Sequence, residues 1–148
     1  MANVIEIARA SITAYNDKDW SKAKETLAAD AVYDEKGTHR RIQGVGEIID
    51  ALQGWAKAFP DSRATFVREF ASGNTAVFEL VWKGVHTGPL QTPTGTIPAS
   101  NKPVELPACQ VVQVEGDKVK STSHYFDMLT MLTQIGATQS AAPHQSAA

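Results

Sequence analysis

The first third of the chain carries apolar residues at spacings of three and four, which is the period of an amphipathic helix. This spacing predicts a helix over residues 1–16, with one face formed by Ile5, Ala8, Ile12 and Tyr15. The polar run 16–19 ends that helix and offers capping oxygens for a second one, which would bury Trp20, Ala23 and Leu27. A third helix is predicted between Gly44 and Pro60, because proline disfavours helical geometry in the residue before it.

Beyond Pro60 the apolar period shortens to two residues, which indicates β-strands. Strands are predicted near residues 62–71, 75–86, 103–114 and 118–126, and an earlier one near 31–42. The pattern predicts an α+β fold, with three N-terminal helices packed on a curved antiparallel sheet and a short C-terminal helix. We expect a single domain over residues 1–136 and a disordered tail over 137–148.

Composition excludes several classes of protein. The 148 residues include 14 Lys and Arg against 16 Asp and Glu, so no basic surface is available for nucleic acid. No apolar stretch approaches the roughly 20 residues of a membrane span, and the N-terminus does not resemble a signal peptide. The single cysteine, Cys109, excludes an internal disulfide. We therefore expect a cytoplasmic protein without a nucleic-acid or membrane partner.

The alternation on strand 75–86 separates two faces. One face is large and apolar, carries Phe78 and Trp82, and ends at His86, so we expect it to point inward. The other face is rich in valine, at positions 77, 81 and 85. Because an exposed apolar sheet face usually has a partner, the sequence predicts a homodimer through this outer sheet face.

On strand 118–126 the lysines at 118 and 120 are expected to mark the solvent side. On this assignment His124 points outward unless a bulge intervenes. The residues that point inward are Val119, Ser121, Ser123, Tyr125 and Asp127. Asp127 has two interpretations. It precedes the last helix and could be its N-cap, or it could be a pocket acid or base whose pKa is raised by desolvation.

Several short motifs occur in an order and spacing that resembles the SnoaL-like polyketide cyclases of the NTF2-like superfamily. They are Ala58-Phe59-Pro60-Asp61, Gly84-Val85-His86-Thr87-Gly88-Pro89, Pro93-Thr94-Gly95, Tyr125-Phe126-Asp127 and Gln134-Ile135-Gly136. The resemblance extends from about Val4 to Gly136. It implies a cone-shaped fold around an apolar cavity, and aldol-type ring closure or a related lyase or isomerase reaction on a hydrophobic carbonyl compound, without metal or cofactor.

The resemblance also suggests site residues. Asp127 matches the family's general acid/base best, His86 falls in the segment that often holds a pocket histidine, and Tyr15 resembles a pocket-lining tyrosine. Asp34 is a substitute base. The remaining candidates for substrate contact are aromatic residues, namely Tyr33, Trp55, Phe78, Trp82 and Tyr125. Ser121 and Ser123 stand where related sequences often have Glu and Trp, so the substrate stays open.

Two other functions stay open. The same cone could be a non-catalytic small-molecule binding protein, or an epoxide hydrolase-like enzyme with a carboxylate–arginine–carboxylate set. The hydrolase requires Arg63 or Arg68 to point into the cavity. The sequence shows no metal-ligand spacing, dinucleotide fingerprint, P-loop or GxSxG elbow.

Overall fold

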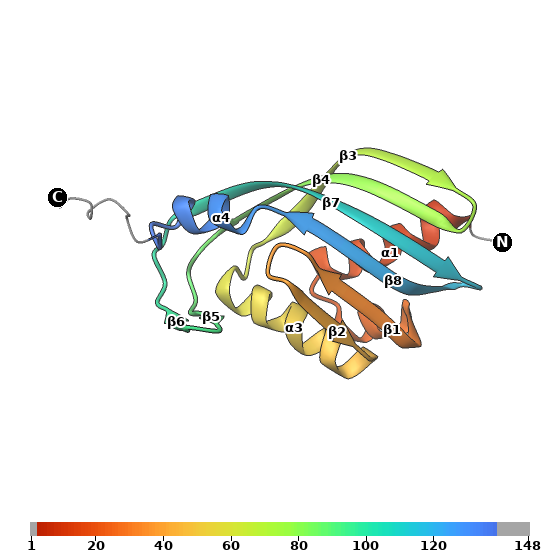
Figure 1. The fold of residues 1–148 in the computed structure, drawn as a ribbon, viewed down its shortest axis with the longest axis horizontal. Coiled ribbons are helices and arrows are strands. Elements are labelled where there is room, and N and C mark those ends of the chain that lie inside the picture. Colours follow the sequence, from red (N-terminus) through yellow and green to blue (C-terminus); the bar gives the residue numbers. More distant parts are fainter. Residues whose placement is uncertain (1–2, 139–148) are drawn as a thin grey trace.

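The computed structural model describes residues 3–138. Its helices are α1 (Val4–Asn16), α2 (Trp20–Glu25), α3 (Val45–Ala58) and α4 (Met128–Gln134). Its strands are β1 (Leu27–Glu35), β2 (Arg40–Gln43), β3 (Arg63–Ser72), β4 (Thr75–Val85), β5 (Leu90–Thr92), β6 (Gly95–Ile97), β7 (Pro103–Glu115) and β8 (Lys118–Phe126). The predicted α+β class is confirmed: helices α1 and α3 lie on one side of a curved sheet (Figure 1).

The main sheet has six strands in the order β2-β1-β8-β7-β4-β3, and β5 and β6 form a separate hairpin. The expected purely antiparallel sheet is wrong in one place, because β1 pairs parallel with β8. The hairpin of β1 and β2 lies between α2 and α3, so the three helices are not consecutive. This parallel pairing brings the inward residues of β1 beside the inward residues of β8.

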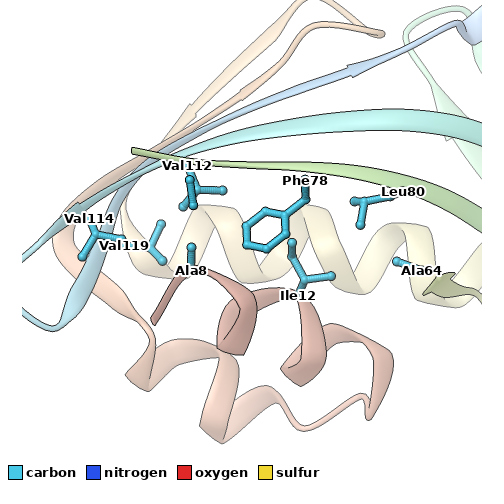
Figure 2. Close-up of a cluster of buried hydrophobic side chains, with 9 residues drawn as sticks. Ala8, Ile12, Ala64, Phe78, Leu80, Val112, Val114 and Val119 are labelled. Carbon is cyan, nitrogen blue, oxygen red and sulfur yellow. The ribbon is translucent and has the colours of Figure 1, made fainter. Parts of the chain in front are cut away.

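Helix α1 anchors the core against the sheet. Asn3 and Glu6 form a capping box at its start, with the side chain of each accepting a hydrogen bond from the other's backbone N–H. Ala8 and Ile12 then pack against apolar side chains from the sheet strands, among which Phe78 is fully buried (Figure 2). The predicted inward direction of Phe78 is correct, but its ring belongs to this core.

A β-bulge at Lys120 decides which residues of β8 face inward. Val119 pairs with Val114 and Ser121 pairs with Gln113, so Lys120 is an extra residue between two pairs. One extra residue reverses the alternation that follows it. Thr122 and His124 are therefore buried, whereas Tyr125 is 47% exposed. The expected inward direction of Ser121, Ser123, Tyr125 and Asp127 is wrong for this reason.

Two expectations concern the chain as a whole. Among residues 3–138, no helix is long and apolar enough to cross a membrane. The cytoplasmic location stays a prediction. Most of the predicted disordered tail, residues 139–148, lies outside the described residues.

The connection between β4 and β7 packs closely against the end of α3. The N–H of Gly88 donates to the carbonyl of Ala58 at 3.1 Å, and a Cβ at Gly88 would lie 2.0 Å from the carbonyl oxygen of Lys57. Leu90 is buried in the same cluster as Ala58 and Phe59. Only glycine fits at position 88 without displacing the loop.

We expect Gly88→Ala to lower the free energy of unfolding by about 1–3 kcal/mol, because the added methyl overlaps backbone. The matched control is Gly54→Ala, at an exposed α3 position with open space around it. That change should raise stability by up to about 1 kcal/mol, since alanine is the better helix former. Denaturant unfolding measures both. Equal stability of Gly88→Ala and the unmodified protein would contradict the described packing of this loop.

Candidate functional site

A cavity of about 110 Å³ lies between the inner face of the sheet and the helices. Helical and turn residues supply a mostly apolar wall, including Ile12, Ile48, Leu52, Trp55, Phe59 and Met131. The sheet supplies a more polar wall, including Tyr33, Trp82, Gln110, Thr122 and His124. A cavity with one apolar side and a few placed polar groups is typical of small-molecule sites.

A hydrogen-bonded chain of three side chains crosses the sheet wall. The hydroxyl of Tyr33 on β1 lies 2.6 Å from Nδ1 of His124 on β8. The indole N–H of Trp82 on β4 donates to Nε2 of His124 at 3.1 Å. All three side chains line the cavity.

The indole fixes the tautomer of the imidazole. Because an indole N–H can only donate, Nε2 of His124 must be the acceptor and carries no proton. A neutral His124 then has its proton on Nδ1 and donates it to the phenol oxygen of Tyr33. The Tyr33 O–H is consequently free to donate to another partner.

Burial keeps both groups neutral. Desolvation lowers the pKa of His124 to about 4, opposed in part by the negative charge of Glu35. Desolvation also raises the pKa of Tyr33 well above its usual value, and the charge of Glu35 adds to that rise. At neutral pH the chain therefore presents a protonated phenol and an uncharged imidazole.

A second phenol, Tyr15 on α1, lines another part of the cavity. Its hydroxyl lies 2.6 Å from Oγ of Ser62, and its ring meets that of Trp82 edge to face with centroids 5.3 Å apart. Burial raises the pKa of Tyr15 to about 12, although the hydrogen bond to Ser62 works in the opposite direction. Tyr15 and Ser62 therefore provide two further uncharged hydroxyl groups in the cavity lining.

A buried carboxylate supports the wall from behind. Glu35 is 1% exposed, and Oε1 accepts from Nε and Nη2 of Arg40 at 3.0 and 2.8 Å. Its Oε2 accepts from the indole N–H of Trp55 at 2.8 Å. Because these donors satisfy the charge, Glu35 positions Trp55 as a cavity wall. The substitute base Asp34 instead pairs with Lys36.

The sequence candidates separate into two groups. Tyr15, Tyr33, Trp55 and Trp82 all contribute to the cavity lining. The others lie elsewhere, and Phe78 belongs to the core beneath α1. The role of the four lining aromatics in substrate binding stays a prediction.

Asp127 lies outside the cavity, as the N-cap of α4. Its carboxylate accepts from the N–H of Leu129 at 3.0 Å and from the hydroxyl of Thr130 at 2.8 Å. The hydroxyl of Thr130, together with the backbone N–H groups of Leu129 and Thr130, holds the pKa of Asp127 below its usual value. Of the two interpretations of Asp127, the structure shows the helix cap, and the pKa shift is opposite to the one expected for a pocket base.

His86 is fully buried but does not line the cavity. Its ring packs on Phe59 with centroids 5.2 Å apart, and its Nδ1 accepts from the N–H of Ser100 at 3.1 Å. Desolvation lowers its pKa. His86 thus connects the two ends of the loop between β4 and β7.

The lining also includes six polar residues that are not among the sequence candidates, namely Ser11, Ser62, Lys83, Gln110, Thr122 and His124. Simple alternation places His124 on the outward face, and only the bulge at Lys120 turns it inward. Gln110 lies on the inward face of β7, directly opposite His124 in the strand register. A glutamine within an apolar alternating strand was the available signal.

Comparison with known proteins identifies the family. The family model of SnoaL-like polyketide cyclases matches residues 5–135. Among proteins with curated descriptions, none matches this chain in sequence.

Solved structures show the same fold. IdmH from Streptomyces antibioticus, described as a candidate polyketide cyclase, has 21% identity and a TM-score of 0.78 over 91% of this chain and 99% of its own. A protein with a ketosteroid isomerase-like fold from Catenulispora acidiphila, solved with trimethylamine, has 19% identity and a TM-score of 0.76 over 90% and 94%. AclR from Streptomyces galilaeus, described as a candidate hydroxylase, has 16% identity and a TM-score of 0.77 over 91% and 96%.

The lowered pKa of His124 predicts acid sensitivity. As pH falls below about 6.5, His124 becomes protonated in the unfolded state. In the folded state it becomes protonated only near pH 4. His124 should therefore remove about 3 kcal/mol of stability over that interval and none above it. Unfolding free energies measured from pH 7 to 4 should fall less steeply for His124→Asn.

The matched control is His39→Asn, because His39 is exposed on a turn. It should keep the pH dependence of the unmodified protein. Identical slopes for His124→Asn and His39→Asn would show that His124 is not buried in the neutral form.

Proposed function

The chain belongs to the SnoaL-like polyketide cyclase family, and from this premise we propose that it is a cofactor-free acid/base enzyme acting on a hydrophobic carbonyl compound. The reaction is an aldol-type ring closure or a related lyase or isomerase step. The observation that supports it most is the chain from Trp82 through His124 to Tyr33 in the wall of an apolar cavity. This arrangement directs one phenol O–H towards a bound carbonyl oxygen.

Tyr33 is the proposed donor to that oxygen. A hydrogen bond from a fixed donor in a water-poor site stabilises the negative charge that develops on an enolate oxygen. The same bond makes the neighbouring C–H more acidic. The raised pKa of Tyr33 keeps its proton in place while the enolate forms.

His124 is the proposed proton acceptor, because the described lining includes no carboxylate. Its Nε2 takes the proton from carbon after the bond from Trp82 is released, and the charge of Glu35 favours the resulting imidazolium. The carbanion then attacks a second carbonyl of the same molecule, and His124 returns the proton to the new alkoxide. Electrons and protons balance without a cofactor.

One observation favours the second candidate, a non-catalytic binding protein. Nε2 of His124 is engaged by Trp82, and burial makes the imidazole a weak base. The hydrolase alternative loses its main support, because Arg63 and Arg68 are both exposed and Arg68 pairs with Glu79.

Exchange of carbon-bound protons tests the enzyme proposal without knowledge of the substrate. We expect the protein to accelerate exchange of the C1 protons of 2-tetralone in D₂O, followed by proton NMR. Tyr33→Phe should reduce the enzymatic rate about 100-fold, since it removes the oxyanion donor. His124→Asn should reduce it at least about tenfold, since it removes the base.

Asp127→Asn is the control, because asparagine also caps helices and the side chain lies outside the cavity. Its exchange rate should stay within about twofold of the unmodified protein. Loss of exchange in this variant would make Asp127 the catalytic residue. Binding of 2-tetralone with exchange at the buffer rate would favour the binding protein.

We also propose a homodimer through the outer sheet face, as the valine pattern of β4 predicts. Among the described elements, no helix covers this face (Figure 1). Val77, Val81 and Val111 lie on it partly exposed, and Tyr125 is 47% exposed. An apolar sheet surface of this kind is typical of a protein interface.

Sedimentation should give twice the monomer mass at micromolar concentrations. Val111→Lys should sediment as a folded monomer, since a buried unpaired charge opposes association. Gln53→Lys, on the exposed side of α3, should remain dimeric. A monomeric unmodified protein would contradict the dimer.

A further inference from the structure

Gln110 carries a side-chain carboxamide that forms no hydrogen bond with the described residues. The residue is 5% exposed and lines the cavity. Among the described residues, its carboxamide has no hydrogen-bond partner, and the same holds for the hydroxyl of Thr122, which is 6% exposed. Buried carboxamides are normally paired, so an unpaired one requires an explanation.

The carboxamide opens onto the cavity. Of the described side chains, only His86 has a polar atom, Nε2, that is both inaccessible and unpartnered. The polar atoms of Gln110 therefore keep accessible surface, and a residue that is 5% exposed can keep it only towards the cavity that it lines. The same reasoning places the Thr122 hydroxyl on this surface.

The strand register sets these groups beside the proposed reaction centre. Gln110 lies opposite His124 on adjacent strands, and Thr122 lies opposite Tyr33 on the parallel pair. The four residues form one polar strip, while the facing helices supply mainly apolar groups. A ligand that is hydrogen-bonded to Tyr33 therefore lies close enough to form a second hydrogen bond with Gln110 or Thr122.

The side chains of this polar strip favour an uncharged polar group on the ligand. A carboxamide both donates and accepts, and a hydroxyl does the same. Neither offers a charge to offset the desolvation of an anion or a cation. Lys83 also lines the cavity, but it is exposed and pairs in register with Glu105 on the outer face. A hydroxyl or second carbonyl on the ligand matches the strip best.

We propose that Gln110 determines specificity in this cavity by binding a second, uncharged oxygen group of a hydrophobic ketone, with Thr122 beside it. The inference rests on the proposed function, since Tyr33 binds the first oxygen. It narrows the substrate class to hydrophobic ketones that also carry a hydroxyl or a second carbonyl. Gln110 contacts the ligand and takes no part in proton transfer.

The test compares acetophenone with its 3′- and 4′-hydroxy derivatives, titrated into ¹⁵N-labelled protein and followed by NMR. We expect at least one hydroxy derivative to bind about tenfold more tightly than acetophenone, which is the gain from one additional buried hydrogen bond. The same derivative should shift the side-chain amide signals of Gln110. Gln110→Leu should remove the preference, so that the hydroxy derivative binds no more tightly than acetophenone.

Gln113→Leu is the matched control, because it makes the same change on the same strand at an exposed, outward position. It should keep the full preference. Gln110→Leu should also be at least as stable to denaturant as the unmodified protein, since it replaces an unpaired buried amide by an apolar group. A structural role for Gln110 would instead give a less stable variant.

The proposal is overturned if the hydroxy derivatives bind no better than acetophenone, or if Gln110→Leu keeps the preference. Cavity water alone on Gln110 would give the first of these results. Tyr33→Phe distinguishes the role of Gln110 from the proposed function, because this variant should weaken the binding of all three probes alike. Acetophenone binding that depends on Tyr33, without any gain from the hydroxyl, removes only the role of Gln110. Acetophenone binding that is absent or independent of Tyr33 removes the proposed function.

Discussion

The indole N–H of Trp82 is the constraint on which the site depends, because it can donate a hydrogen bond and cannot accept one. Its bond to Nε2 leaves His124 a single neutral tautomer, and that tautomer donates to the phenol oxygen of Tyr33. The Tyr33 proton is then directed away from the protein chain. The proposed stabilisation of the enolate oxygen uses this directed O–H. Before any proton transfer the arrangement carries no charge in the cavity, which agrees with burial keeping both titratable groups neutral.

The bulge at Lys120 is what allows this bond to form. Strand β8 begins with Val119 inward, and regular alternation would then bury Ser121, Ser123 and Tyr125. The extra residue exchanges the two faces and places His124 between Tyr33 and Trp82. Lys120 itself pairs with Asp30, on the stretch of β1 where the register with β8 also shifts. An ion pair thus lies at the two irregularities that set which residues of β8 face the cavity. The same reversal moves Asp127 out of the cavity and into the cap of α4.

The sequence predicts the architecture well because periodicity and breakers act locally. The helix ending before Pro60 and the strand pairs around Asn74 and Gly116 follow from neighbouring residues, as does the cap at Asp127. Tyr33 and Trp82 were also predicted as inward aromatics. The inward position of His124 was not predictable, because its direction depends on one unpaired residue in a strand that otherwise alternates. Gln110 was missed because its significance comes from the absence of a partner, which only the packed fold reveals. The parallel pairing of β1 with β8 was likewise not predictable, because it depends on tertiary structure and not on neighbouring residues.

The orientation of the Tyr33 O–H depends on which ring nitrogen of His124 carries its proton, and NMR can locate that proton. Two-bond ¹H–¹⁵N NMR correlations of the His124 ring at pH 7 distinguish a protonated nitrogen from an unprotonated one. We expect a protonated Nδ1 and an unprotonated Nε2, and we expect Trp82→Phe to remove this preference. A proton on Nε2 of His124 in the unmodified protein would contradict it, because the Tyr33 O–H would then be held by the imidazole instead of facing the cavity.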